Sequence, residues 1–133
     1  MATARPGDEA DLVRGLGADE VVDFTTGLEA QVRELAPQGV DAVLHFAGDA
    51  GHLLALLRES GSFVSTLGFG PDQHPGAVAL MADPSGATLE RLAADLAAGR
   101  VRLHVEKAYR LEEAPQAIAD FSVGSVGKLA LTI

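Results

Sequence analysis

Apolar positions follow two different spacings along the chain, and the spacings alternate from one segment to the next. Runs of consecutive apolar, β-prone residues predict strands, whereas leucines and valines that recur every three or four residues predict helices. The expected strands cover residues 21–24, 40–47, 62–67, 77–82, 103–108 and 128–133. The expected helices cover residues 28–35, 53–57, 84–98 and 111–121. The first twenty residues predict the end of a strand, a turn and a further helix, as expected if the chain began partway through a domain.

Three short motifs predict where helices begin and end. Thr26 and Glu29 fit a capping box, in which a hydroxyl and a carboxylate each accept a bond from the other residue's free backbone N–H group. Asp83 and Pro84 fit the N-cap and the first turn of the next helix. The sequence GLGADE at 15–20 follows a helix, so we expect a helix C-cap there.

The order of strands and helices predicts the fold class. Regular alternation is typical of α/β proteins, in which right-handed crossovers build a mainly parallel sheet with helices on both faces. Residues 40–47 are nearly all apolar, which indicates a strand that is covered on both faces. The chain has 133 residues and no linker or internal repeat, so it is expected to form one layered α/β structure.

Composition and charge remove several classes of function. The chain has no cysteine and therefore no disulfide, thiolate metal ligand or cysteine nucleophile. Its net charge of −9 argues against a nucleic-acid partner and against an anionic membrane surface. No apolar run approaches the roughly 18 residues of a membrane span, and the acidic N-terminal region does not fit a signal peptide. We therefore expect a soluble, cytoplasmic protein.

Motifs for phosphate binding and catalysis are incomplete. GLGADE and GFGPDQ (68–73) each lack the third glycine of a dinucleotide fingerprint, and GSVGKL (124–129) lacks two required residues of a P-loop. The four histidines do not have the spacing of metal ligands. His45 lies near the carboxyl end of a strand, where open α/β sheets place ligands, but we interpret it as a packed strand histidine. The prediction is that this chain holds no catalytic residue and no metal site.

Four segments carry a family resemblance that covers nearly the whole chain. They are ARPGDEADLVRGLGADEVVDF (4–24), GVDAVLHFAG (39–48), GSFVSTLGF (61–69) and YRLEEAPQAIADFSVGSVGKLALTI (109–133). In this order they resemble the cofactor domain of medium-chain zinc-type alcohol dehydrogenases and quinone oxidoreductases, from its second strand to its closing strand. LGADEVVD, at 16–23, is similar to a frequent landmark of that family.

The resemblance implies a Rossmann-like, doubly wound sheet that lacks its first strand and its glycine-rich turn. In this fold the spatial strand order is 3-2-1-4-5-6, so the first strand lies between the second and the fourth. Residues 1–133 would then form a partial dinucleotide-binding domain, without the catalytic domain of the family. The second and fourth strands would present unpaired edges, which favour a homo-oligomer through edge pairing or swapping.

The resemblance also implies which residues contact a cofactor. Arg5 follows the second strand, where an arginine suits the 2′-phosphate, so NADP(H) is favoured over NAD(H). Ala47 and Gly48 end the fourth strand, where the cofactor ribose would pass. Gly68 and Phe69 end the fifth strand and would border the nicotinamide. The alternative at each position is structural: a solvated arginine, an ordinary turn or a surface loop.

Two further positions qualify this assignment. Lys128 matches the Gly-Lys that precedes the last strand of the family, where it would neutralise a cofactor phosphate, or it is a solvated edge-strand lysine. His45 stands where the family often has an acidic residue, so a polar contact with the cofactor is not inferred there.

The expected parent protein is an NADP(H)-dependent oxidoreductase that moves hydride between the nicotinamide and a small carbonyl or enone substrate. The isolated chain is expected to have little or no catalytic activity, because it would only position the cofactor. Two alternatives stay open at this point. One is a methyltransferase that uses S-adenosylmethionine, and the other is a non-catalytic module that self-associates through its sheet edges.

Overall fold

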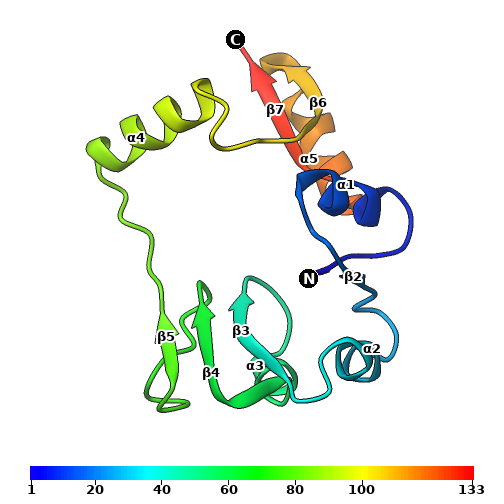
Figure 1. The fold of residues 1–133 in the computed structure, drawn as a ribbon. Coiled ribbons are helices and arrows are strands. Elements are labelled where there is room, and N and C mark those ends of the chain that lie inside the picture. Colours follow the sequence, from blue (N-terminus) through cyan, green and yellow to red (C-terminus); the bar gives the residue numbers. More distant parts are fainter.

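The computed structural model describes residues 1–133, and strands and helices alternate along the chain (Figure 1). The N-terminal elements are β1 (Ala2–Thr3), α1 (Asp8–Leu16), β2 (Val21–Val22) and α2 (Leu28–Leu35). The central elements are β3 (Val40–His45), α3 (Ala50–Leu54), β4 (Leu57–Ser65), β5 (Ala77–Ala79) and α4 (Gly86–Ala97). The C-terminal elements are β6 (Val105–Arg110), a 3-10 turn (Leu111–Glu113), α5 (Ala114–Val123) and β7 (Lys128–Thr132). Every strand pair is parallel, which confirms the predicted α/β class.

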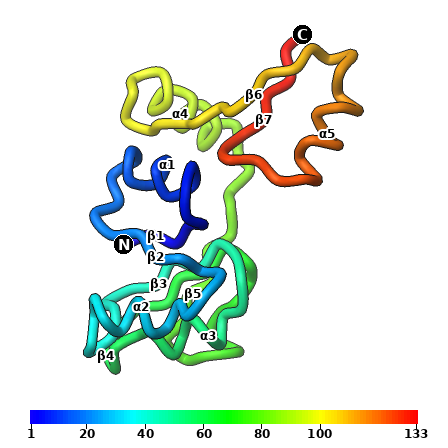
Figure 2. Tube along the Cα trace, turned by 90° about the vertical axis from the view of Figure 1, so that its right-hand side faces the viewer, coloured from blue at the N-terminus to red at the C-terminus, as the bar shows by residue number.

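The strands form three separate parallel sheets and not the single sheet that the alternation predicts. One sheet pairs β1 with β2, the central sheet has the order β3-β4-β5, and the third pairs β6 with β7. The β6–α5–β7 unit lies apart from the central sheet in both views (Figures 1 and 2). β1 and β3 each have only one paired neighbour, so the expected unpaired edges of the family's second and fourth strands are confirmed.

A small apolar core joins the N-terminal sheet to the central sheet. Its buried members come from β2, from α2 and from the segment just before β4: Val22, Val32 and Leu56. Leu28, Val40 and Leu53 pack around them. A polar contact joins the N-terminal elements to the segment before β6, because the Arg102 guanidinium donates to the carbonyl oxygens of Gly15 (3.0 Å) and Leu16 (2.8 Å) at the end of α1.

Much of the apolar surface of the sheets has no cover. Only 12 of 133 residues are buried, far fewer than a closed domain of this size requires. Leu44, in β3, is 63% exposed, and Phe46, just beyond it, is 64% exposed. The prediction that residues 40–47 are covered on both faces is therefore wrong, because no element of the chain packs over these side chains.

Local hydrogen bonds move two of the predicted helix starts. α2 begins after Gly27, which has φ 58° and makes no side-chain cap, so the capping box at Thr26 is wrong. The Thr26 hydroxyl instead donates to the Asp23 carboxylate at 3.2 Å. α4 begins after Ser85, whose Oγ accepts from the Thr88 N–H at 3.2 Å, so Asp83 is not the N-cap.

Other boundaries agree with the sequence or differ by a few residues. Gly17 is the C-cap of α1, with φ 114° and its N–H bonded to the Arg14 carbonyl oxygen, as GLGADE predicts. The helix expected at 53–57 lies earlier, at Ala50–Leu54, because the Asp49 carboxylate caps it by accepting from the His52 N–H at 3.0 Å. None of the helices combines the length and the apolar character that crossing a membrane requires.

Candidate functional site

The carboxyl ends of β3 and β4 lie side by side in the central sheet. The two strands are in parallel register with His45 opposite Ser65, and the Thr66 N–H donates to the His45 carbonyl oxygen at 3.1 Å. The turn after β3 contains Ala47 and Gly48, while the loop after β4 contains Gly68 and Phe69. The structure thus brings four of the six sequence-predicted cofactor residues to one edge, and open α/β sheets bind ligands at this kind of edge.

The two glycines give this edge an open surface. Gly48 has φ 87° and Gly68 has φ 80°, a backbone conformation that favours glycine. A Cβ built on either residue would meet no atom within 4 Å, so a ligand has room to approach the backbone closely. The N–H groups of Ala47, Gly48, Gly68 and Phe69 have no acceptor within the chain. This edge therefore offers both space and unused hydrogen-bond donors.

Three aromatic side chains pack against one another beside this edge. Phe63 in β4 is fully buried. Its ring contacts His45 on one side, with centroids 5.5 Å apart, and Phe69 on the other in an edge-on arrangement at 5.3 Å. The contact with buried Phe63 places the Phe69 ring next to the end of β4.

His45 is buried and hydrogen-bonded, which confirms its interpretation as a packed strand histidine. It is 3% exposed. Its Nδ1 lies 2.9 Å from Ser65 Oγ, and its Nε2 lies 3.2 Å from the carbonyl oxygen of Gly48. Ser65 Oγ also accepts from the Leu67 N–H at 3.0 Å.

Arg5 lies two residues after the end of β1, which belongs to the N-terminal sheet and not to the central sheet. Its Nη1 is 3.3 Å from Glu9 Oε1, and its backbone N–H donates to the other Glu9 carboxylate oxygen at 2.9 Å. The guanidinium also stands over the Phe24 ring, 5.7 Å from its centroid. The Arg5 side chain is 63% exposed, so its remaining donors are open to solvent or to an anion.

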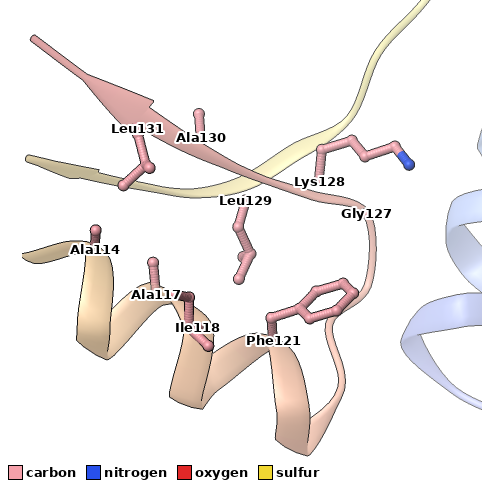
Figure 3. Close-up of a pocket in the computed structure, with 9 residues that line it drawn as sticks. All are labelled: Ala114, Ala117, Ile118, Phe121, Gly127, Lys128, Leu129, Ala130 and Leu131. Carbon is pink, nitrogen blue, oxygen red and sulfur yellow. The ribbon is translucent and has the colours of Figure 1, made fainter. Parts of the chain in front are cut away.

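Lys128 is the sixth predicted residue, and it lies in the separate β6–β7 sheet, away from the central sheet. It is the first residue of β7 and is exposed. Figure 3 shows it at the end of a groove between β7 and α5 that is lined mainly by apolar residues, among them Ile118, Phe121 and Leu129. Lys128 therefore does not share a site with Gly48 and Gly68 within this chain.

A polar cluster that sequence reasoning missed ties β6 to α5. One oxygen of the Asp120 carboxylate accepts from the Tyr109 hydroxyl at 2.6 Å and from Lys107 Nζ at 2.9 Å. The other oxygen accepts from the Gln116 side chain at 2.6 Å. These bonds, with that of Tyr109 the strongest, lower the pKa of Asp120 to about 2. The bond to Asp120 in turn raises the pKa of Tyr109.

The sequence does contain a signal for this cluster. Lys107 and Tyr109 are two residues apart, which places both on one face of a strand, and Gln116 and Asp120 are four apart on a helix. What the sequence alone does not give is the docking of α5 against that face. The cluster joins two elements of the C-terminal unit and contacts none of the predicted cofactor residues.

The chain offers no site for a metal ion. It contains no group of three or more His, Cys, Asp or Glu side chains close enough to hold one.

Comparison with known proteins assigns the family. Residues 16–131 match the family model for zinc-binding dehydrogenases. The chain belongs to the zinc-binding dehydrogenase family. This membership confirms the resemblance inferred from LGADEVVD and the segments that follow it, and it argues against the methyltransferase alternative. None of the curated proteins matches the sequence.

Solved structures of dehydrogenases and reductases share the fold of this zinc-binding dehydrogenase chain. An NAD-dependent alcohol dehydrogenase is 23% identical, with TM-score 0.75 over 98% of this chain and 43% of its own. The protein AibC is 23% identical, with TM-score 0.77 over 99% and 44%. The CurK enoyl reductase is 19% identical, with TM-score 0.69 over 99% and 47%. These likenesses confirm a Rossmann-like arrangement, and the chain spans less than half the length of each of these structures.

Proposed function

We propose that the chain is the cofactor-binding part of an oxidoreductase that uses NADP(H). The paired ends of β3 and β4, with their two open glycine turns, support this proposal most strongly. In the whole protein, hydride would move between C4 of the nicotinamide and a carbonyl or an enone. Residues 1–133 would act as a partial dinucleotide-binding domain, and the catalytic groups would come from a separate domain.

The role of this chain is to hold and orient the cofactor. The backbone at Gly48 and Gly68 allows the ribose and the nicotinamide to lie against the sheet edge, and Phe69 supplies an apolar wall. The cofactor supplies the hydride chemistry when it is bound. Since none of these residues exchanges a proton near neutral pH, we propose no catalytic residue here, and the isolated chain is expected to be inactive.

A preference for NADP(H) would come from Arg5. The net charge of −9 repels an anionic ligand at long range, so a local cation has to hold the 2′-phosphate. Arg5 follows β1 at the position where the dinucleotide fold recognises the adenosine ribose. It is bound to a single carboxylate, Glu9, and a phosphate of nearly two negative charges competes well for it. Lys128 is proposed as a weaker phosphate contact.

Nucleotide titration followed by saturation-transfer NMR tests the proposal. We expect the 133-residue chain to bind NADPH weakly through its adenosine end, with NADH weaker still and S-adenosylmethionine not bound. Arg5→Ala should lower the NADPH affinity about fivefold and remove the preference over NADH. Arg14→Ala is a matched control, because Arg14 also pairs with a carboxylate on α1, at 3.3 Å from Asp11. Binding of S-adenosylmethionine in preference to NADPH, or no nucleotide binding at millimolar concentration, would contradict the proposal.

Self-association is a second candidate function, favoured by the unpaired edges of β1 and β3. The exposed Leu44 and Phe46 side chains, on β3 and just beyond it, add an uncovered apolar face beside the β3 edge, which a swapped homo-oligomer would cover. Sedimentation velocity over a hundredfold range of protein concentration tests this candidate. A mass that stays that of a monomer at every concentration excludes it.

A further inference from the structure

His45 is the one buried histidine of the chain, and the proposed function does not yet use its polar atoms. His52, His74 and His104 are all exposed. His45 lies at the last position of β3, between the two turns that form the proposed cofactor edge. Its Nδ1 contacts Ser65 at the end of β4, and its Nε2 contacts Gly48 in the turn after β3.

The donors and acceptors around His45 specify where the ring proton lies. Ser65 Oγ accepts the N–H of Leu67, so its single proton is free to be donated. The acceptor within reach is His45 Nδ1, at 2.9 Å. The neutral ring then carries its proton on Nε2, which faces the carbonyl oxygen of Gly48 at 3.2 Å. The result is a directed series of bonds from the loop after β4 to the turn after β3.

We propose that His45 is a positioning residue for the cofactor. With Ser65, it ties the turn at Gly48 to the loop at Leu67, and this fixes the distance between the two surfaces that the dinucleotide contacts. The inference rests on the proposed function, because it requires that the dinucleotide binds at this edge.

Packing alone does not account for a histidine at this position. The His45 ring contacts the Phe63 ring, and a phenyl ring at position 45 would keep an aromatic contact there. A phenyl ring would leave the Ser65 hydroxyl and the Gly48 carbonyl without their partner, and both turns would lose their link. The His45→Phe variant therefore separates packing from positioning.

The experiment measures NADPH affinity and melting temperature together. His45→Phe should weaken NADPH binding about tenfold, because both turns lose a hydrogen bond. Ser65→Ala should have a similar effect, and the double variant should add little to either single change. His45→Gln should recover most of the affinity, because its amide again offers one acceptor and one donor. Ser62→Ala is the control, because Ser62 lies exposed on the same strand and its hydroxyl makes no hydrogen bond within the chain.

The outcomes distinguish the two proposals. A His45→Phe variant that melts earlier but binds NADPH as the wild type does overturns the positioning role and leaves the proposed function standing. A wild-type chain that binds no NADPH overturns both. Should His45→Phe fail to fold, the NADPH affinity of Ser65→Ala tests the positioning role instead, because this variant removes only the oxygen atom that bonds to His45.

The protonation of the ring gives a test that does not depend on the cofactor. Nitrogen-15 NMR of the wild-type chain should show the proton of His45 on Nε2 and a bare Nδ1. A proton on Nδ1 of the neutral ring would leave Nε2 without a proton for the Gly48 carbonyl oxygen, so the link to the turn after β3 would be lost and the proposal overturned.

Discussion

The two parallel strand pairs β3–β4 and β6–β7 each have a polar side-chain link, but the links differ in burial and in the elements that they join. At the carboxyl end of β3–β4, the polar link is buried and joins His45 to Ser65, and both flanking turns are open. In β6–β7, the polar link is ionic and joins the strand to its crossover helix through Asp120. The first link therefore lies between the two turns of the proposed cofactor edge, whereas the second attaches α5 to β6.

The glycines of the two pairs show the same difference. Gly48 and Gly68 face open space at the carboxyl ends of their strands. Gly127, just before β7, is crowded, because a Cβ there would lie 2.5 Å from the His104 ring and 2.9 Å from the His104 carbonyl oxygen. Close approach of chain to chain accounts for Gly127, whereas Gly48 and Gly68 are favoured by their positive φ and leave open space beside the backbone.

The largest expected effect comes from truncating the phenylalanines of the two pairs. Phe63→Ala removes a fully buried ring and should lower the free energy of unfolding by about 3–5 kcal/mol. Phe121→Ala, in the groove beside β7, removes a ring that is 70% exposed and should change it by less than about 0.5 kcal/mol. Urea unfolding of both variants measures the difference. Equal losses would mean that α5 buries its apolar face in solution.

A second contrast concerns the crowded glycines that precede β3 and β7. At Gly39, with φ 90°, a new Cβ would meet only backbone atoms of residues 56–58, the nearest at 2.6 Å. At Gly127, with φ 114°, the nearest atom belongs to the His104 side chain, which can rotate away, so the His104 carbonyl oxygen at 2.9 Å is the one backbone atom left in close contact. Gly39→Ala should therefore cost about 3 kcal/mol or more and Gly127→Ala about 1–2 kcal/mol. Gly15→Ala, in a helix with open space, is the control that should not destabilise. The reverse order of costs would contradict the geometry at both glycines.

A smaller effect depends on pH and is confined to the β6–β7 unit. The pKa of Asp120 is lowered from 3.8 to about 2, so its ionised form stabilises the folded state. This contribution is complete above about pH 4 and is lost as the pH falls toward 2. Asp120→Asn should lower the melting temperature at neutral pH and flatten its decline below pH 4. Identical acid profiles for the variant and the wild type would show that the cluster does not form in solution.

The sequence predicted the order of elements because apolar spacing and glycine positions are local signals. The C-cap at Gly17 depends only on its own backbone conformation, and it was predicted correctly. The helix starts at Thr26 and Asp83 were wrong, because nearby side chains compete for the same N–H groups and hydroxyls. Ser85, which lies closer to the first turn of α4, takes the role that the sequence pattern assigned to Asp83.

The candidate site was predictable in part. Ala47, Gly48, Gly68 and Phe69 follow strands that pair in parallel, so their shared edge follows from topology. The His45–Ser65 bond was not predictable, because it depends on the register of two strands that are 20 residues apart in the chain. The distance of Lys128 from this edge was missed for the same reason, since the separation of β7 from the central sheet is a property of the whole fold.

Amide-resolved NMR of the labelled chain during an NADPH titration tests the central claim most directly. We predict that the largest shifts occur at residues 46–49 and 67–70, with a separate response at Arg5, while residues 105–132 change little. Shifts concentrated around Lys128 and α5, with Gly48 and Gly68 unchanged, would contradict the account and place nucleotide binding at the β6–β7 unit.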